Sequence, residues 1–553
     1  MKLVTELRDK AFRWLADDPD AGDKAELQQV LARAMGGDET AVAELEDRMS
    51  GELTFGTAGL RGPERAGPNG MNTAVVVRAT AGIAAWLRAQ GHAGGVVMVG
   101  RDARHGSAKF AEAVASVLAG AGFDARVLPG PLPTPILSFL TRGTAAVAGI
   151  QITASHNPPA DNGYKVYLSD GAQISPAEAN VIEAAIRGGA AAVSVPRSDT
   201  YTTVSSSEVD TYATHVAALA RGDSRDLTVA LTPMHGVGGA TAVDVLARAG
   251  FTDVHLVAPQ AEPDPAFPTV SFPNPEEPGA TDLLLATASD VDADLAIALD
   301  PDADRCALGV RSPDGGWRML RGDETGVLLG DYILSTLDRM THPDPLVATT
   351  IVSSSMLGSV AAAHGARYDE TLTGFKWLVR AGDGHGTGLV YAYEEALGHC
   401  VDPDSVRDKD GISAAVLACS LAASLKAAGR TVLDALDDLA VAHGVHVTDQ
   451  VSVRVTDLAR IGQLMARLRS APPSSIAGVA VTAEDLLPRT DGLRWSGEGV
   501  RVVVRPSGTE PKVKAYLQVK APVADASALA DVRSAATEKL ASVRDEVAAL
   551  LAG

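Results

Sequence analysis

Short apolar runs alternate with longer segments of helical periodicity over most of this 553-residue chain, which limits the folds open to it. In three successive rounds, apolar runs and helical stretches follow one another in the order typical of a mostly parallel sheet covered by helices. The expected strands are residues 95–99, 124–128, 145–152, 227–231, 254–257, 295–299, 346–352 and 389–393. We therefore expect repeated α/β units in place of one large core.

The two ends of the chain depart from this alternation. Residues 1–50 place apolar side chains at helical spacing without a strand pattern, so we expect a helical extension there. The last hundred residues combine short strand patterns with two helical stretches, which predicts an antiparallel sheet in a smaller α+β domain. The sequence thus predicts three similar mixed α/β domains followed by a smaller α+β domain. The expected boundaries are 1–50, 51–205, 206–320, 321–443 and 444–553.

Charge and cysteine content exclude several classes of protein. A net charge of -21 without any cluster of Lys and Arg argues against nucleic acid or an anionic membrane as a partner. Cys306, Cys400 and Cys419 form no Cys-x-x-Cys pair, so we expect a reducing compartment and no zinc site. The N-terminal residues lack a signal-peptide core, and the longest apolar helix candidate is too short for a bilayer. We therefore expect a cytoplasmic protein.

A polar loop with the sequence Thr-Ala-Ser-His-Asn-Pro-Pro follows the predicted strand 145–152. It lies at the carboxyl end of that strand, where open α/β sheets bind their ligands. Because two prolines stiffen the loop after Asn157, we expect Ser155 to stand at an exposed rim on a rigid support. A serine held in this way suits phosphoryl transfer. A plain Ser/Asn-rich turn is the alternative.

A second polar loop, Asp-Pro-Asp-Ala-Asp-Arg at residues 300–305, follows the predicted strand 295–299. Alternate carboxylates on an extended loop present hard oxygens on one side, which suits Mg²⁺. An EF-hand is disfavoured because Arg305 and Arg311 occupy the positions that would need Gly and Glu. An aspartyl-phosphate phosphatase is disfavoured because Asp304 stands where such an enzyme would have Thr. An acidic, solvated turn is the alternative.

Two further loops carry groups that suit sugar and phosphate. Glu394, Glu395 and His399 follow the predicted strand 389–393, where they could bind sugar hydroxyls and a phosphate. Residues 505–512, Arg-Pro-Ser-Gly-Thr-Glu-Pro-Lys, combine a guanidinium, hydroxyls and exposed N–H groups in one turn, as a phosphate cradle does. A solvated acidic loop and an ordinary hairpin turn are the alternatives.

Cationic side chains near these loops are informative because the chain is acidic overall. An anionic substrate would need a local positive pocket. The candidates are Arg61, Arg101, Arg104, Lys165 and Lys376. The two lysines could equally be ordinary surface side chains.

Taken in this order, the four loops resemble those of the α-D-phosphohexomutase superfamily of phosphoglucomutases and phosphomannomutases, from about residue 51 onward. Residues 300–305, 375–377 and 408–411 look most like the branch of type-2 phosphoglucomutase/phosphopentomutase. The resemblance implies four domains around a central cleft and an isomerase of carbohydrate metabolism that interconverts glucose 1-phosphate and glucose 6-phosphate. Mannose or pentose phosphates are the near alternatives. A phosphatase and a non-catalytic sugar-phosphate-binding protein are the distant ones.

The resemblance also implies a role for individual residues. It implies a phosphoserine at Ser155, with Mg²⁺ held by Asp300, Asp302, Asp304 and an oxygen on Ser155. The implied groups for acid/base catalysis and for holding the reacting oxygens are His156, Lys376, Lys165 and Arg61. The implied substrate contacts are Arg305, Glu394, Glu395, His399, Arg505, Ser507, Gly508, Thr509 and Lys512.

Glucose 1,6-bisphosphate is the implied intermediate and activator, and small sugar phosphates are the expected partners. We expect neither nucleic acid nor a membrane among the partners. We expect the protein to be a monomer or a homodimer. One position departs from the resemblance: Leu397 stands where many hexose-phosphate members carry serine. The loop that carries Glu394, Glu395 and His399 therefore lacks one hydroxyl contact, which leaves the preferred sugar open.

Overall fold

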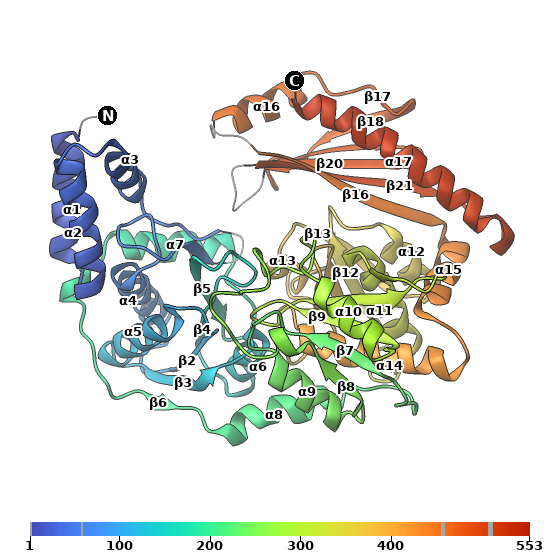
Figure 1. Cartoon of the computed structure of the whole chain (residues 1–553), viewed down its shortest axis with the longest axis horizontal. Coiled ribbons are helices and arrows are strands. Elements are labelled where there is room, and N and C mark those ends of the chain that lie inside the picture. The colour runs from blue at the N-terminus through green and yellow to red at the C-terminus, as the bar shows by residue number, and fades with distance from the viewer. Residues whose placement is uncertain (1–2, 57–58, 455–458, 507–511, 553) are drawn as a thin grey trace. The chain divides into compact units, whose positions relative to one another are not determined.

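The computed structural model describes residues 3–56, 59–454, 459–506 and 512–552, and it forms two compact units (Figure 1). The first unit contains Met1–Arg311 and Asp402–Ser420, and the second contains Ser312–Val401 and Leu421–Gly553. Helix α14 (Gly411–Ala427) therefore begins in the first unit and ends in the second.

The first sheet has six strands in the order β1-β5-β4-β2-β3-β6. Strand β2 is parallel to β3 and β4, whereas β5 is antiparallel to both β4 and β1. The strands are β1 (Leu60–Pro63), β2 (Val96–Arg101), β3 (Asp124–Pro131), β4 (Ala148–Ile152), β5 (Asp161–Leu168) and β6 (Thr202–Thr203). The helices that accompany them are α4 (Thr73–Ala89), α5 (Ser107–Gly120), α6 (Thr134–Gly143), α7 (Pro176–Arg187) and the short η1 (Ala192–Ser194).

The N-terminal helices belong to the core of this sheet. They are α1 (Thr5–Asp17), α2 (Ala21–Met35) and α3 (Glu39–Arg48). Leu7, Leu27 and Leu45 lie in the same buried cluster as side chains of α4 and α5. Asp23 also accepts a hydrogen bond from the Thr73 N–H, at the first residue of α4, at 3.1 Å. The extension is therefore packed against the first sheet.

The second sheet carries residues 300–305, the loop with three aspartates, which we call the acidic loop. Within the first unit its strands lie in the order β10-β9-β7-β8, with β7 parallel to β8 and β9, and β10 antiparallel to β9. The strands are β7 (Val229–Thr232), β8 (Val254–Leu256), β9 (Leu295–Leu299) and β10 (Cys306–Arg311). The helices are α8 (Ser206–Ala217), α9 (Gly239–Arg248), α10 (Asp282–Asp290) and the short η2 (Ala258–Gln260).

Residues 402–420 return to the first unit after the third sheet has been formed. The Tyr167 hydroxyl donates to Asp408 Oδ2 at 2.9 Å, and the Tyr212 hydroxyl donates to Asp410 Oδ1 at 2.9 Å. Asp410 Oδ1 also accepts from the first N–H groups of α14. The returning segment is thus held by buried hydrogen bonds to β5 and α8.

The third sheet has the order β13-β12-β14-β15, with β12 parallel to β13 and β14, and β15 antiparallel to β14. Its strands are β12 (Leu346–Thr350), β13 (Arg367–Thr371), β14 (Leu389–Glu394) and β15 (Gly398–Cys400). This part of the chain also contains β11 (Trp317–Met319), α11 (Gly322–Ser335), α12 (Met356–Ala363), α13 (Phe375–Leu378) and α15 (Val432–His443).

The last sheet is antiparallel throughout its described pairs, in the order β16-β21-β20-β19-β18-β17. Helix α17 (Leu529–Ala552) lies across it (Figure 1) and buries Leu540, Val543 and Val547 with the sheet residues. The strands are β16 (Val445–Arg454), β17 (Ser475–Ile476), β18 (Val479–Asp485), β19 (Leu493–Gly497), β20 (Val500–Pro506) and β21 (Lys512–Ala521). The other helices are α16 (Ala459–Ser470) and the short η3 (Ala526–Ala528).

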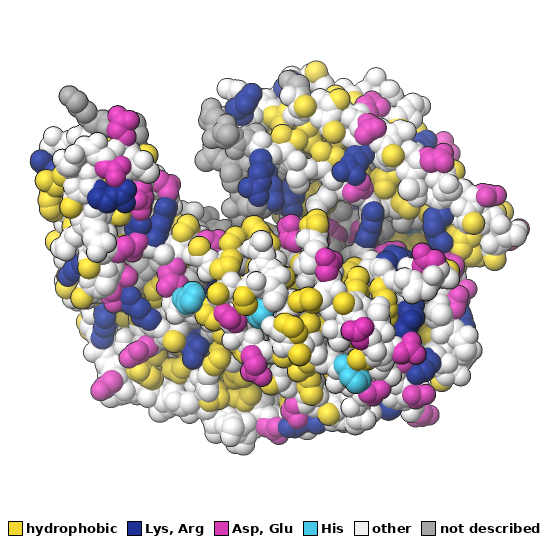
Figure 2. Space-filling view, viewed as in Figure 1, with side chains coloured by type: hydrophobic (Ala, Val, Ile, Leu, Met, Phe, Trp, Pro, Cys, Tyr) yellow, Lys and Arg dark blue, Asp and Glu magenta, His cyan; other side chains and the backbone are white. Residues whose placement is uncertain are grey.

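Three mixed α/β sheets followed by an α+β domain confirm the fold class expected from the sequence. On the face seen in Figure 2, side chains of Lys and Arg are interspersed with those of Asp and Glu. Among the described residues, no single helix is long and apolar enough to cross a membrane; only α14 and α15 taken together, with a bend of 92° between them, pass by length and composition.

Candidate functional site

Three carboxylates gather in the loop between β9 and β10. Asp300, Asp302 and Asp304 are fully buried, and one oxygen from each lies within 4.8 Å of the others. Burial, together with the charges of Asp304 and Asp302, raises the pKa of Asp300 well above its ordinary value. Asp302 Oδ1 and Asp304 Oδ1 are buried without a hydrogen-bond partner in the described part of the chain. Buried hard oxygens with free lone pairs fit a divalent cation, so this cluster could hold a metal ion.

Strand β5 brings a lysine against this cluster. Lys165 Nζ lies 2.7 Å from Asp302 Oδ2 and 2.8 Å from Asp304 Oδ2, and the side chain is 1% exposed. Burial opposes the charge, but the two carboxylates prevail and raise the pKa of Lys165. Lys409 adds a second cation at 3.4 Å from Asp304 Oδ2. Although burial acts in the opposite direction, these cations hold the pKa of Asp304 below its ordinary value.

Ser155 reaches the cluster from the loop between β4 and β5. Its Oγ donates to Asp300 Oδ2 at 2.8 Å and lies 3.1 Å from His156 Nδ1. The residue has φ 54°, in the left-handed region, and its N–H donates to Thr153 Oγ1 at 2.8 Å. Ser155 is only 1% exposed. The exposed rim expected from the sequence is therefore wrong, because the hydroxyl is covered by the acidic loop.

Two arginines lie near the loops that carry Ser155 and the three aspartates. Arg61 Nη1 donates to Asn157 Oδ1 at 3.2 Å, and Arg305 Nε lies 3.9 Å from oxygens of Asp300 and Asp304. Burial and the charges of Arg305 and Arg61 lower the pKa of His156 well below its ordinary value. His156 is therefore neutral near pH 7. An anionic group on the serine would be favoured by these charges.

The sequence did not predict two contacts in this cluster. Thr134, the first residue of α6, donates from its Oγ1 to Asp302 Oδ2 at 2.5 Å. Lys409 lies in a segment quoted for its resemblance, but it received no role. The only available signal for Thr134 was its place at a helix start after a predicted strand. Its partner is 168 residues away, which no local pattern reveals.

The loop for which the sequence predicts sugar contacts follows β14 in the second unit. Glu395 Oε2 accepts hydrogen bonds from Ser353 Oγ at 2.9 Å and from Thr350 Oγ1 at 3.2 Å, and Glu394 precedes it as the last residue of the strand. Leu397 is 3% exposed and has φ 66°, and a leucine side chain carries no polar group. One carboxylate is thus oriented by two hydroxyls, one at the last residue of β12 and one three residues beyond it.

Helix α13 of the same unit holds another buried lysine. Lys376 is 8% exposed, and its Nζ has no hydrogen-bond or ion-pair partner among the residues that the structure describes. Burial and the charge of Arg380 lower its pKa below the ordinary value. This lysine can lose its proton more readily than an exposed one.

The other predicted contacts of the second unit lie in different surroundings. His399 is fully buried, and its Nδ1 lies 3.0 Å from the Tyr391 hydroxyl, which places it in the core beside β14. Arg505 lies near the end of β20, and Lys512 begins β21. Ser507, Gly508 and Thr509 lie outside the described residues, so their predicted role in binding phosphate stays a prediction.

The structure therefore groups the predicted residues in two sets. The first unit brings together Ser155, His156, Arg61, Lys165, Arg305, Asp300, Asp302 and Asp304. The second unit carries Lys376, Glu394, Glu395, His399, Arg505 and Lys512.

Comparisons with known proteins cover nearly the whole chain. Residues 52–192, 210–315 and 321–441 match the alpha/beta/alpha domains I, II and III of phosphoglucomutase/phosphomannomutase, and residues 451–548 match its C-terminal domain. A "Probable phosphomannomutase" of Haemophilus influenzae is 43% identical over 82% of this chain and 93% of its own length. A phosphoglucomutase of Staphylococcus aureus is 33% identical over 87% of this chain and 92% of its own length.

Solved structures show the same fold. A phosphoglucomutase/phosphomannomutase family protein of Burkholderia thailandensis superposes with a TM-score of 0.67 at 21% identity, over 88% of this chain and 97% of the other. The open form of the Paramecium phosphoglucomutase parafusin superposes with a TM-score of 0.64 at 19% identity, over 88% and 95% of the two chains.

Proposed function

Because the chain belongs to the phosphoglucomutase/phosphomannomutase family of phosphosugar mutases, which are intramolecular phosphotransferases, we propose that Ser155 carries the transferred phosphoryl group. The observation that carries this proposal is the 2.8 Å contact of Ser155 Oγ with Asp300 beside two further buried carboxylates. The serine would pass its phosphoryl group to a hexose 1-phosphate, and the resulting 1,6-bisphosphate would return the other phosphoryl group to the serine.

The first-unit cluster supplies the electrostatics that such a transfer needs. Asp300, Asp302 and Asp304, with an oxygen on Ser155, would hold Mg²⁺, and the two buried oxygens without partners support this assignment. Bound there, the ion would balance negative charge on the transferring group. Lys165 stays protonated between two carboxylates. Its fixed ammonium would face the oxygens of the transferring group as well.

Proton transfer falls to groups whose pKa values lie below their ordinary range. His156 is neutral, and its Nδ1 lies 3.1 Å from Ser155 Oγ, so it would accept the proton of the serine hydroxyl. Lys376 would exchange a proton with a sugar hydroxyl, and Glu395 would accept a hydrogen bond from another. Arg505, Ser507, Gly508, Thr509 and Lys512 would hold the phosphate that does not react.

We take glucose 1-phosphate and glucose 6-phosphate as the substrate pair, with glucose 1,6-bisphosphate as activator. The Staphylococcus aureus relative, named a phosphoglucomutase, supports this choice. Mannose phosphates are the second candidate, because the relative at 43% identity is named a probable phosphomannomutase. Turnover of glucose 1-phosphate and mannose 1-phosphate, each with its own bisphosphate and Mg²⁺, distinguishes the two. A higher kcat/KM for mannose 1-phosphate would replace glucose in this proposal.

The phosphoserine itself is tested by transfer of ³²P from glucose 1,6-bisphosphate. Wild-type protein should take up label on the peptide that contains Ser155, and Ser155→Ala should take up none. Ser198→Ala is the control, since the Ser198 hydroxyl forms an exposed hydrogen bond with that of Thr200, at 2.8 Å. Label retained by Ser155→Ala would remove this serine from the mechanism.

We place the enzyme in the cytoplasm, acting on small sugar phosphates. The three cysteines are free and buried, which is in keeping with a reducing compartment. The net charge of -21 supports neither nucleic acid nor an anionic membrane as a partner. Fractionation of the source cells, with antibody detection, tests the location.

A further inference from the structure

One buried side chain holds the backbone of the loop between β4 and β5 that contains Ser155. Arg104, which follows β2, is 3% exposed. Its guanidinium donates hydrogen bonds to four carbonyl oxygens, those of Ser155 at 2.6 Å, Asn157 at 2.7 Å and Pro158 at 2.7 Å in the loop, and that of Asp161 at 3.0 Å at the start of β5. A single group therefore binds the backbone at the serine, at two later points of the loop and where the loop ends.

The loop needs such support from outside. Ser155 has φ 54°, a conformation that an L-residue seldom adopts and that its surroundings must maintain. Pro158 and Pro159 have no N–H, so the loop has few donors of its own to satisfy its carbonyl oxygens. The four bonds from Arg104 supply these donors and fix the direction of the serine side chain.

Arg104 keeps no exposed donor for a ligand. A guanidinium carries five N–H groups, and the four on Nη1 and Nη2 match the four carbonyl oxygens. The fifth, on Nε, makes no hydrogen bond within the described residues, but it is buried and lies 3.2 Å from Asp102 Oδ2 in an ion pair. The ring of Phe267 lies on one face of the guanidinium, 5.2 Å from Cζ. The guanidinium is thus buried and engaged with the loop backbone, through which we take Arg104 to act.

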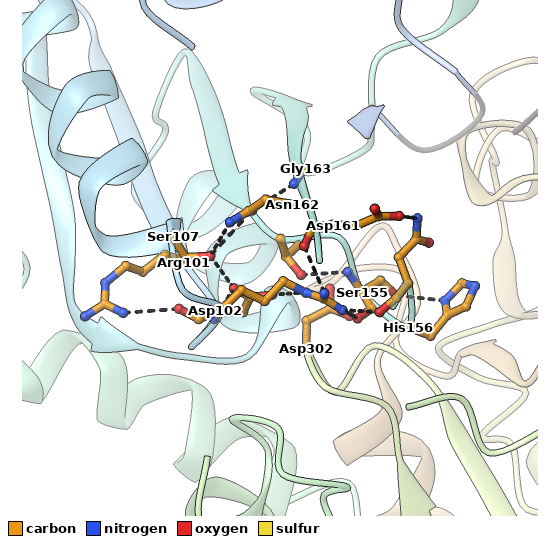
Figure 3. A network of polar contacts seen from close by, with 12 residues as sticks. Arg101, Asp102, Ser107, Ser155, His156, Asp161, Asn162, Gly163 and Asp302 are labelled. Carbon is orange, nitrogen blue, oxygen red and sulfur yellow. Dashed lines mark hydrogen bonds and ion pairs between the residues drawn. The ribbon is translucent and has the colours of Figure 1, made fainter. Parts of the chain in front are cut away.

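The arginine is itself anchored by a network that Figure 3 draws from Arg101 and Asp102 to Asn162. Asp102 Oδ1 accepts from Ser107 Oγ at 2.5 Å and from the Arg104 N–H at 3.0 Å. Ser107 Oγ in turn accepts from Asn162 Nδ2 at 3.2 Å. The support therefore connects β2, α5 and β5, which are rigid elements of the first sheet.

We propose that Arg104 is the positioning residue of the phosphoryl transfer: it holds Ser155 so that its Oγ stays in contact with Asp300. This inference rests on the proposed function, in which Ser155 carries the phosphoryl group. Replacing Arg104 frees the loop while the acidic loop, between β9 and β10, keeps its own supports. Displacement of a reacting group by about 1 Å can lower a rate about 10²-fold.

The test compares Arg104→Lys with Arg126→Lys. Lysine keeps the charge but cannot span four acceptors with one planar fork. Arg126, in β3 of the same sheet, is the control because its guanidinium binds a partly exposed carboxylate, Asp124 Oδ2, at 2.8 and 3.0 Å. For Arg104→Lys we expect the rate of ³²P transfer from glucose 1,6-bisphosphate and kcat to fall about 10²-fold. We expect KM for glucose 1-phosphate and the affinity for Mn²⁺ to stay within threefold of the wild type, and Arg126→Lys to change none of these values.

A folded Arg104→Lys protein with labelling within threefold of the wild type would overturn the proposal, as would equal losses in both variants. If Arg104→Lys does not fold, Arg104→Ala refolded with millimolar guanidinium ion replaces it: guanidinium should restore labelling where ammonium does not, and restoration by both or by neither overturns the inference. Wild-type protein that takes up no label at all would instead contradict the proposed function, so the two failures are distinguishable.

Discussion

Lys165 and Lys376 are both buried lysines, but the two units of the molecule give them opposite surroundings. In the first unit, Lys165 lies 2.7 and 2.8 Å from two carboxylates and is 1% exposed. In the second, Lys376 is 8% exposed, and no acceptor for its ammonium lies among the described residues. The pKa of Lys165 is raised, whereas burial and Arg380 lower the pKa of Lys376.

The difference shows that burial alone does not decide what a lysine can do. Both side chains lose hydration, which disfavours the charged form. Two carboxylates outweigh this loss at Lys165, so the group is a permanent cation suited to binding negative charge. Among the described residues, no carboxylate compensates for this loss at Lys376, so that group can give up and take back a proton. The following predictions test this contrast, with stability as the common measure, from the largest expected effect to the smallest.

Lys165→Met should destabilise the first unit strongly. It leaves Asp302 buried without its ammonium partner, while Asp304 keeps Lys409 at 3.4 Å. Breaking a buried ion pair from one side costs about 3–5 kcal/mol. Urea unfolding without divalent ions, with hydrogen exchange to follow β4 and β5, measures the loss. Lys109→Met is the matched control, because Lys109 also lies 3.1 and 3.2 Å from two carboxylates but is 44% exposed. Its removal should cost less than about 1 kcal/mol; equal costs for both would contradict the contrast.

Asp302→Asn should have an intermediate effect on stability and remove metal binding. The amide keeps the size of the side chain, but Lys165 then relies on Asp304 alone, which we expect to cost about 1–3 kcal/mol. Calorimetry with Mn²⁺ should show that binding is lost, and turnover should fall about 10³-fold. Asp290→Asn, at the exposed end of α10, serves as the control. Mn²⁺ binding that survives in Asp302→Asn would remove this carboxylate from the metal site.

Lys376→Met should not destabilise the second unit, although it should lower turnover about 10²-fold through loss of the proton-transferring group. The folded protein disfavours the charge of Lys376, so an apolar side chain of similar length should leave stability unchanged or raise it by up to about 1 kcal/mol. The same urea titration measures this. A loss of several kcal/mol would show that Lys376 has a stabilising partner and would break the contrast with Lys165.

The smallest effect concerns pH. Because the pKa of Lys376 is lower in the folded than in the unfolded protein, the unfolded state binds more protons between the two values, and stability rises with pH across that window. The stability advantage of Lys376→Met should therefore be largest below the lowered pKa of the folded protein and vanish as the pH approaches the ordinary lysine value of about 10.4. Urea titrations of both proteins at several pH values test the sign. A gap that widens with pH would exclude a lowered pKa.

The sequence predicted most of the parallel strands and of the helices between them, because their apolar residues recur at regular spacing, but it missed the parallel strands β6 and β13. It did not predict β5 as a strand, since its first residues, Asp161, Asn162 and Gly163, read as a turn. Lys165 in the middle of this strand is buried only because Asp302 and Asp304 approach it from a loop more than a hundred residues away. No local pattern contains that information.

The candidate site shows the same limit. Motif order placed Ser155 and the three aspartates in one site, and the 2.8 Å contact between Ser155 and Asp300 agrees with it. The role of Arg104 could not be predicted, because its four acceptors are carbonyl oxygens, which every residue possesses. Backbone acceptors become specific partners only when the loop is folded.

The return of residues 402–420 to the first unit has a consequence for biosynthesis. When translation has reached Arg311, all three aspartates of the acidic loop have been made. Lys409 and the hydrogen-bond acceptors of Tyr167 and Tyr212, Asp408 and Asp410, have yet to be translated. Since domains otherwise tend to fold in order as they emerge, this unit must wait with polar groups unsatisfied until the next sheet has been made. A nascent chain stalled before residue 402 is thus the state in which we expect chaperones to bind this protein.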